Sequence, residues 1–303
     1  MLFAKNPEYS LLAKGAVYSI VIENDILYAA TDAGSIDVFN WKTKMLKKNI
    51  SFPMIKDFMG DEMAPKIYSI DKWPNKDRII AVTQGKHGFR NIFMVDNGIR
   101  TQIFDAEKDK MMIKKALFFA EDKILLATLG NEIMLYDLQK KTFVYIKQLS
   151  TSVFSDFTIN PEKTLLATAD ESGIIHIMDA LSGELVEELR GQSVDNIYQL
   201  AFANNVVVGA GQDRRAVVYK RTTHQAYFVE SSFLIYSVGI SDDGKYAAFS
   251  SGEKNNIQVF NTSTKKTKVI LEGQRSTLTQ IKFVNQEYMI TTSEDKNIMV
   301  WKW

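Results

Sequence analysis

The side chains best suited to acid–base or metal chemistry are few and far apart in this chain of 303 residues. The histidines are His87, His176 and His224, and no two of them have the spacing of metal ligands. The chain contains no cysteine, which excludes disulfides, thiolate zinc sites and cysteine nucleophiles. Motifs for serine nucleophiles, phosphate-binding glycine loops and calcium loops are also absent from the sequence. We therefore predict no catalytic residue, no metal site and no cofactor.

The paired acidic residues have a structural explanation. Asp170-Glu171, Asp242-Asp243 and Glu294-Asp295 fall in predicted turns, where carboxylates accept hydrogen bonds from nearby backbone amides. An enzyme hidden in this chain would need carboxylates that converge from different segments, which a sequence does not reveal. His176 lies in a predicted strand and is expected to be a packed or edge residue rather than a ligand.

Composition and charge describe an ordinary globular chain. The 37 basic and 36 acidic residues give a net charge of +1, so nothing attracts the whole molecule to nucleic acid or to anionic membrane. Residues 1–10 include Lys5, Pro7 and Glu8 where a signal peptide needs an apolar run, and no apolar stretch of about 18 residues occurs. We expect no membrane insertion and a cytoplasmic location, or a periplasmic one if a signal peptide has been removed.

The elements that position these side chains repeat along the chain. Seven predicted strands end in a hydrophobic residue followed by a polar one, and the last six endings lie about 41 residues apart. The endings are Phe39-Asn40, Val95-Asp96, Tyr136-Asp137, Met178-Asp179, Tyr219-Lys220, Phe260-Asn261 and Trp301-Lys302. Each copy contains four short β-runs, the fourth more polar than the others, which predicts four antiparallel strands in one propeller blade.

The two ends of the chain predict how the repeat closes. The seventh copy stops at Trp303, after its third strand, and residues 6–12 precede the first copy at the distance expected of a fourth strand. We predict that residues 6–12 complete the last blade, since this pairing would remove an open sheet edge. We also expect residues 1–303 to form a single domain.

These features resemble the WD40-repeat β-propellers in three respects: the period, the first turn Ser241-Asp242-Asp243-Gly244, and the Trp-Asp-like strand ending. The resemblance implies an all-β, seven-bladed WD40-like β-propeller closed by an N-terminal strand that completes the last blade. No copy has the Trp-Asp pair itself, and the family's Gly-His pair is missing, although Asp213 and Asp295 stand where its aspartate partner would. We therefore expect the family's polar network to be absent.

Aromatic residues recur in the first strand of several copies. Packing between blades is expected to replace the missing polar network, with these aromatics forming an inter-blade core; the alternative is a stacking platform that lines the central channel. The residues are Tyr18, Tyr68, Phe154, Tyr198 and Tyr236.

A narrower resemblance rests on two neighbouring segments, 55–61 (Ile-Lys-Asp-Phe-Met-Gly-Asp) and 65–71 (Pro-Lys-Ile-Tyr-Ser-Ile-Asp). They are similar to the WD40-type accessory protein of bacterial periplasmic nitrate-reductase systems, the NapL type. This resemblance implies an accessory role in nitrate respiration or in maturation of the molybdenum enzyme. No mechanistic motif accompanies it.

The best functional indication is a break in the repeat. The interval between Phe39 and Val95 is longer than the period, because residues 51–65 extend the link between the first two blades and residues 84–90 lengthen a hairpin. Both should emerge on the same face of a propeller, and loop insertions on one face of a repeat array commonly form its binding surface. Residues 51–65 could instead fold against the second blade with their apolar side chains buried, or cover a small molecule.

We therefore predict a non-catalytic protein-interaction scaffold with an unidentified protein partner, and nucleic acid ranks below protein as a partner. The alternative is a small-ligand binder or enzyme that uses the central channel. Arginines of equivalent loops should add a basic patch to the same face, although each could simply be a solvated loop charge. The partner-binding candidates are Lys56, Phe58, Met59, Asp61, His87, Arg90, Arg190, Arg214, Arg215 and Arg275.

Overall fold

The computed structural model describes residues 4–303, which group into two compact units. Unit 1 contains residues 4–10, 149–294 and 298–303, and unit 2 contains residues 11–148 and 295–297. Each unit is described by itself, and the expectation of a single domain stays a prediction. The one helix among these residues is the 3-10 turn η1 (Lys86–Gly88), so no helix in residues 4–303 has the length and apolarity needed to cross a membrane.

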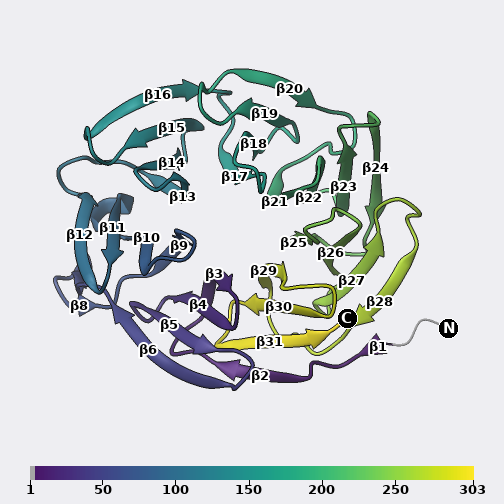
Figure 1. Cartoon of the computed structure of the whole chain (residues 1–303), viewed down its shortest axis with the longest axis horizontal. Coiled ribbons are helices and arrows are strands. Elements are labelled where there is room, and N and C mark those ends of the chain that lie inside the picture. Colours follow the sequence, from purple (N-terminus) through teal and green to yellow (C-terminus); the bar gives the residue numbers. More distant parts are fainter. Residues whose placement is uncertain (1–3) are drawn as a thin grey trace. The chain divides into compact units, whose positions relative to one another are not determined.

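Unit 2 contains three four-stranded antiparallel sheets, one for each of the first three repeats (Figure 1). Blade 1 consists of β3 (Val17–Glu23), β4 (Ile26–Thr31), β5 (Ser35–Asn40) and β6 (Met45–Ser51). Blade 2 consists of β9 (Ile67–Lys72), β10 (Arg78–Gln84), β11 (Arg90–Asp96) and β12 (Ile99–Phe104). Blade 3 consists of β13 (Ile113–Ala120), β14 (Lys123–Thr128), β15 (Glu132–Asp137) and β16 (Thr142–Gln148).

Most residues of the sheets of the last four repeats belong to unit 1. Blade 4 consists of β17 (Phe154–Ile159), β18 (Leu165–Asp170), β19 (Ile175–Asp179) and β20 (Leu185–Leu189). Blade 5 consists of β21 (Ile197–Ala203), β22 (Val206–Gly211), β23 (Arg215–Lys220) and β24 (Gln225–Glu230). Blade 6 consists of β25 (Val238–Ile240), β26 (Tyr246–Ser251), β27 (Asn256–Asn261) and β28 (Thr267–Leu271). Blade 7 consists of β29 (Leu278–Phe283), β30 (Tyr288–Ser293) and β31 (Asn297–Lys302), joined by β2 (Tyr9–Leu12).

The first strands of six blades share one irregularity, a β-bulge at their second residue. In β3, for example, Val17 pairs with Thr31 and Ser19 with Ala30, so Tyr18 has no partner across the ladder. A bulge turns the side chain of the extra residue away from the regular alternation of the strand. The bulged residues are Tyr18, Tyr68, Lys114, Ser155, Tyr198 and Thr279.

The residue after the bulge links neighbouring blades within each unit. In unit 2 the Ser19 hydroxyl oxygen accepts a hydrogen bond from the Ile70 amide at 3.2 Å, and Ser69 accepts one from Ala116 at 3.1 Å. In unit 1 the Asp156 carboxylate accepts from the Leu200 amide at 2.9 Å, and the Gln199 side-chain oxygen accepts from the Val238 amide at 3.0 Å. Because these atoms are largely buried, leaving such an amide without a partner would cost about 1–3 kcal/mol.

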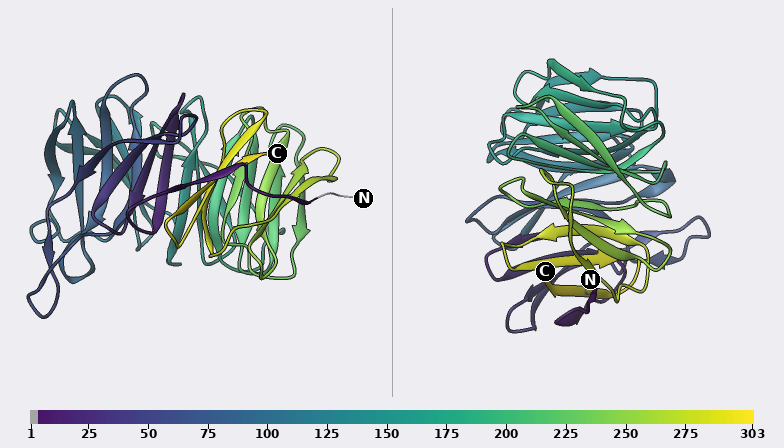
Figure 2. Two further views of the ribbon diagram at one scale, coloured as in Figure 1. Left: turned by 90° about the horizontal axis from the view of Figure 1, so that it is seen from below. Right: turned by 90° about the vertical axis from the view of Figure 1, so that its right-hand side faces the viewer.

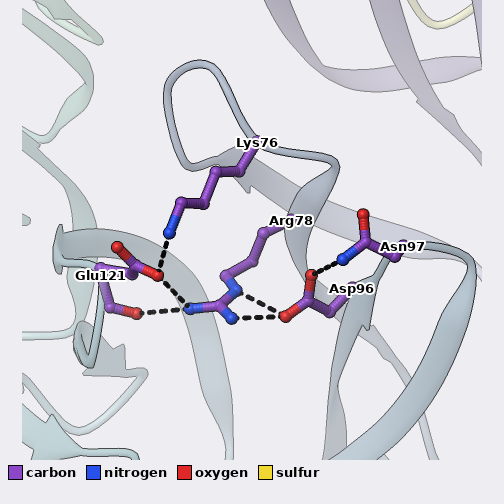
Figure 3. A network of polar contacts seen from close by, with 5 residues as sticks. All are labelled: Lys76, Arg78, Asp96, Asn97 and Glu121. Atoms are coloured by element: carbon purple, nitrogen blue, oxygen red, sulfur yellow. Dashed lines mark hydrogen bonds and ion pairs between the residues drawn. The ribbon is translucent and has the colours of Figure 1, made fainter.

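A charged network joins blades 2 and 3 inside unit 2 (Figure 3). Arg78 donates to one Asp96 carboxylate oxygen through Nε at 2.9 Å and Nη2 at 2.5 Å, and its Nη1 donates to the Glu121 carboxylate at 3.2 Å. Lys76 also donates to Glu121, and Asn97 to the second oxygen of Asp96. The planar guanidinium therefore ties the ends of β10 and β11 to the turn between β13 and β14.

The expectation that the polar network would be absent is wrong for blade 7. The Trp301 indole donates to the Thr291 hydroxyl at 2.8 Å, and that hydroxyl donates to the Gln274 side-chain oxygen at 2.9 Å. The Gln274 amide in turn donates to Ser293 at 2.6 Å. Gln274 follows Gly273 and so stands where the WD40 family has the histidine of its Gly-His pair. The glutamine side chain supplies both a hydrogen-bond donor and an acceptor in place of that histidine.

The last blade is completed by an N-terminal strand, as predicted, because β2 is the neighbour of β31 in its sheet. The preceding residues add a contact that the sequence did not indicate. Ala4 and Lys5 form β1, which pairs in parallel with Ile270 and Leu271 of β28 in blade 6. The N-terminal segment therefore covers strand edges of two neighbouring blades.

Replacing Leu11 by alanine tests the closing strand. Leu11 is 3% exposed, so Leu11→Ala should lower the free energy of unfolding by about 2–5 kcal/mol, measured by denaturant titration. Leu12, the next residue of the same strand, is 70% exposed, and Leu12→Ala should change it by no more than about 0.5 kcal/mol. Equal effects of the two substitutions would contradict the closing role of β2.

Candidate functional site

Residues 51–65 form a small hairpin rather than a loop packed flat on a blade. Its strands are β7 (Ile55–Lys56) and β8 (Glu62–Met63), with Ile55 opposite Met63 and Lys56 opposite Glu62. Figure 2 shows the blue hairpin projecting from the other strands of unit 2. We call residues 54–63 the β7–β8 hairpin.

Hydrogen bonds to Asp57 order the tip of the β7–β8 hairpin. The Asp57 carboxylate accepts from the amides of Met59 at 2.8 Å and Asp61 at 2.9 Å, and the Asp57 amide donates to the Asp61 carbonyl at 3.0 Å. Gly60 has a φ of +93°, a conformation that side-chain-bearing residues rarely adopt. This turn places Phe58 and Met59 in solvent, with exposed fractions of 96% and 72%.

The base of the insertion is buried, in contrast to its tip. Phe52 is 5% exposed and lies in the core cluster shared by blades 1 and 2, with its ring centroid 5.5 Å from that of Phe93. The Phe52 amide also donates to the Gly34 carbonyl at 2.9 Å. The alternative in which all apolar side chains of the insertion are buried is therefore wrong for Phe58 and Met59, although it describes Phe52 correctly.

A groove of about 680 Å³ separates the β7–β8 hairpin from two loops of blade 2. Met54, Ile55 and Lys56 form one side, and the loop beginning at Gly85 together with residues 105–108 forms the other. The two insertions therefore lie beside each other, as predicted. Lys86 and Glu107, from the two loops of blade 2, form an ion pair on the side of the groove opposite the hairpin.

The other candidates of unit 2 have different environments. His87 is exposed, with a φ of +55° in the turn η1. Arg90 is not a solvated loop charge: its guanidinium carbon lies 4.0 Å from the ring centroid of Tyr68, and burial lowers the pKa of Arg90. Arg90 also donates to the carbonyls of Gly88 and Phe89, so it organises the hairpin that follows Gln84.

The remaining arginine candidates all lie in unit 1. Arg190 is paired with Glu188, and Arg215 lies 4.2 Å from the Phe228 ring centroid while donating to the Gln192 carbonyl at 3.2 Å. Arg214 and Arg275 are exposed. Because two of the four already hold intramolecular partners, a basic patch in unit 1 stays a prediction that rests mainly on Arg214 and Arg275.

The recurring aromatics are not one inter-blade core. Phe154 is buried, but it pairs with Asp170 as Val17 pairs with Thr31, so it occupies the first position of its strand, ahead of the bulge. Tyr18, Tyr68 and Tyr198 are bulged residues and only partly buried, which makes the core expectation wrong for them. Sequence alignment of the first strands did not reveal that Phe154 precedes the bulge while these tyrosines occupy it. A bulge shifts the inward and outward alternation of a strand by one residue, and the position of the bulge was not known from the sequence.

The bulged tyrosines instead take part in stacking contacts within each unit. In unit 2 the Lys66 ammonium lies 3.3 Å from the ring centroid of Tyr18 and 5.5 Å from that of Tyr68. In unit 1 the rings of Tyr198 and Tyr236 are stacked, with centroids 5.4 Å apart and planes 18° from parallel. These contacts favour the stacking alternative for the tyrosines over the core one.

The residues considered for chemistry remain dispersed. His176 is buried in β19 with Nε2 3.4 Å from a Glu188 oxygen, and His224 lies exposed in a turn with a φ of +52°. Asp170 accepts hydrogen bonds from Ser150 and from Ser172, as expected of a turn carboxylate. In the part of the chain that the structure describes, no group of three His, Asp or Glu side chains is placed to hold a metal ion.

Comparison with known proteins identifies the fold. No protein-family model matches the chain, and no curated protein matches it in sequence. Among solved structures it is similar to the β-propeller domain of Cps50 (Swd1) from Myceliophteria thermophila, with 14% identity, a TM-score of 0.78 and 99% of each chain covered. Together with the seven blade sheets, six of four strands and one of five, this likeness confirms the predicted class, an all-β, seven-bladed WD40-like β-propeller.

The difference between tip and base of the insertion predicts the effect of substitutions on stability. Replacing Phe58 and Met59 together by serine should change the free energy of unfolding by no more than about 0.5 kcal/mol, because neither side chain is buried. Phe52→Ala should lower it by about 3–5 kcal/mol. Denaturant titration of the two variants distinguishes these outcomes, and a large loss in the double variant would mean that the tip is packed.

Proposed function

We propose that this chain is a non-catalytic scaffold that binds a protein partner through the tip of the β7–β8 hairpin. The observation that carries the proposal is the 96% exposure of Phe58 beside the 72% exposure of Met59, on a turn ordered by Asp57. Single exposed apolar residues are common on protein surfaces. An adjacent aromatic and methionine at the tip of an ordered projection are better explained as a contact that a partner covers.

The geometry of the hairpin favours binding for an energetic reason. Burying a phenylalanine or methionine side chain contributes about 1.5–3 kcal/mol each. Because hydrogen bonds to Asp57 already order the backbone of the tip, little conformational entropy is lost when a partner covers it. We therefore expect Phe58 and Met59 to enter an apolar socket on the partner.

The groove beside the hairpin offers the second part of the interface. It carries both signs of charge, from Lys56 on the hairpin and from Lys86, Glu107 and Lys108 opposite. The Lys86–Glu107 pair neutralises part of this charge, and Asp105 also lines the groove, so Lys56 and Lys108 exceed the remaining negative charge by one. A partner with an apolar socket and an acidic rim fits this surface, and nucleic acid fits it less well because no exposed aromatic row accompanies the lysines.

A narrower candidate is an accessory role in assembly of a nitrate-respiration enzyme in a bacterium. Its support is the sequence similarity of segments 55–61 and 65–71 to the NapL type, and the first of these segments contains the hairpin tip. On this proposal the partner is a subunit or maturation factor of the nitrate reductase. The location of the chain, in the cytoplasm or the periplasm, then decides which of these proteins it can meet.

Affinity capture tests the proposed function. We expect the wild-type chain to retain a specific protein from native extract, and the Phe58→Ser, Met59→Ser double variant to retain at least about tenfold less, since two buried apolar contacts are lost. Bound proteins are identified by mass spectrometry, with cytoplasmic and periplasmic extracts assayed separately. Recovery of a nitrate-reductase component would support the narrower candidate.

Ile99→Ser is the matched control, because Ile99 is also 72% exposed and lies in unit 2 at the start of β12, away from the groove. Its capture profile should equal that of the wild type. Equal retention by the double variant and the wild type would contradict the proposal. A tightly bound small molecule without any protein sensitive to the double substitution would favour a ligand-binding or enzymatic role of the central channel instead.

A further inference from the structure

A second cavity, unrelated to the hairpin, lies in unit 1 between blades 6 and 7. Its volume is about 470 Å³, and it is lined by the turn between β25 and β26, the turn between β29 and β30, and Lys268 of β28. Three aromatic rings form its walls. The Trp303 centroid lies 5.1 Å from that of Tyr246 and 4.9 Å from that of Phe283, with ring planes 68° and 83° apart.

Two lysines contribute positive charge to this aromatic cavity. The Lys268 ammonium lies 3.8 Å from the Trp303 ring centroid and 4.7 Å from that of Tyr246. The Lys245 ammonium lies 5.4 Å from the Tyr246 centroid. Within residues 4–303 neither lysine forms an ion pair with a carboxylate, in contrast to Lys72, which is paired with Glu23 in unit 2.

The surroundings of Lys268 favour an added negative charge. Lys268 is exposed, but partial desolvation of its ammonium group, together with repulsion from Lys5 and Lys245, lowers the pKa of Lys268. The cavity also contains Asp242 and Asp243. The Asp243 carboxylate accepts hydrogen bonds from the Ser241 hydroxyl at 2.6 Å and the Lys245 amide at 3.0 Å, which hold it at the turn. These hydrogen bonds and the charge of Lys245 lower the pKa of Asp243, whereas the charges that shift the pKa of Lys268 are those of Lys5 and Lys245.

A cationic ligand fits this cavity less well than an anionic one. An aromatic cage for a cation needs an open ring face, and the Lys268 ammonium already covers the face of Trp303. Both lysine ammonium groups also lie near the Tyr246 ring, and Phe283 lines the cavity without a lysine over its ring in the described part of the chain. The volume falls in the range of pockets that bind small organic ligands.

We infer that this cavity binds a small organic anion that carries a phosphate or carboxylate together with a planar ring. The anionic group pairs with Lys268 and Lys245, and the ring packs against Phe283 and Tyr246. The site is separate from the β7–β8 hairpin, lies wholly in unit 1 and requires no covalent step. We call it the Lys268 site.

Isothermal titration calorimetry of the full chain tests the Lys268 site with named probes. Adenosine 5′-monophosphate and benzoate represent the phosphate and carboxylate forms, and at least one of them should bind. Neutral adenosine tests the need for charge, and inorganic phosphate tests the need for a ring. Both should bind at least about tenfold more weakly than the better probe, since each lacks one of the two contacts.

Lys268→Gln keeps most of the side chain and removes the charge, and it should weaken the better probe at least about tenfold. Lys266→Gln is the matched control, because Lys266 is exposed and outside the cavity, and it should leave binding unchanged. Unchanged thermal unfolding in both variants separates lost binding from lost structure. Failure of both probes to bind the wild type at millimolar concentration, or equal binding by Lys268→Gln and the wild type, would overturn the inference.

Discussion

The β-bulge at the second residue of the inner strands is the constraint on which the rest of the structure depends. It makes one residue, such as Tyr18 or Tyr68, leave the regular alternation, and it directs the next residue toward the neighbouring blade. The Ser19 and Ser69 hydroxyl oxygens then accept hydrogen bonds from backbone amides of the following blade. The same irregularity recurs in six blades. It therefore accounts for polar links between blades and, in three of the six, for a partly exposed tyrosine.

In this arrangement, the residues that stabilise the fold differ from the residues that are exposed for binding. The first strands, their inter-blade hydrogen bonds and the clusters of apolar residues around them hold each unit together. The β7–β8 hairpin contributes little to that packing beyond its base at Phe52, so its tip is free to present Phe58 and Met59. The Lys268 site follows the same logic in unit 1, because its lysine projects from an outer strand while its aromatic walls lie at strand ends, Tyr246 at the start of β26 and Phe283 at the end of β29. Function can thus vary at tips and turns without altering the inner strands.

Much of the fold could be predicted from the sequence because a repeated pattern averages over local irregularity. The spacing of the strand endings established the number of blades, and the missing fourth strand in the last repeat indicated that residues 6–12 would complete it, where the structure has β2. The bulges could not be predicted, since the extra residue is of no single type: it is a tyrosine in three blades and Lys114, Ser155 or Thr279 in the others. Phe154 was aligned with the tyrosines because it is aromatic, although it precedes the bulge of its strand. The Trp301, Thr291 and Gln274 network was missed because the sequence comparison sought a histidine, whereas an amide can also donate and accept.

The candidate site was predictable in location more than in detail. An insertion of unusual length marked residues 51–65, but only the folded structure shows that hydrogen bonds to Asp57 leave Phe58 in solvent while packing against Phe93 buries Phe52. Arg90 illustrates the opposite case, because its burial against Tyr68 depends on a ring that the bulge reorients. Contacts of this kind join residues from different strands, and no spacing within a single segment encodes them.

In this account the inner strands stabilise the fold, whereas the hairpin tip is exposed for binding and contributes little to stability. Residue-resolved hydrogen exchange of the wild-type chain tests this claim most directly. The amides of Ile70, Ala116, Leu200 and Val238, which donate to side chains of the preceding blade, should exchange only with global unfolding. The Phe58 amide should exchange at least about a thousandfold faster, because tip residues open locally. Protection of Phe58 equal to that of the inner strands, or early exchange of those four amides, would contradict the account.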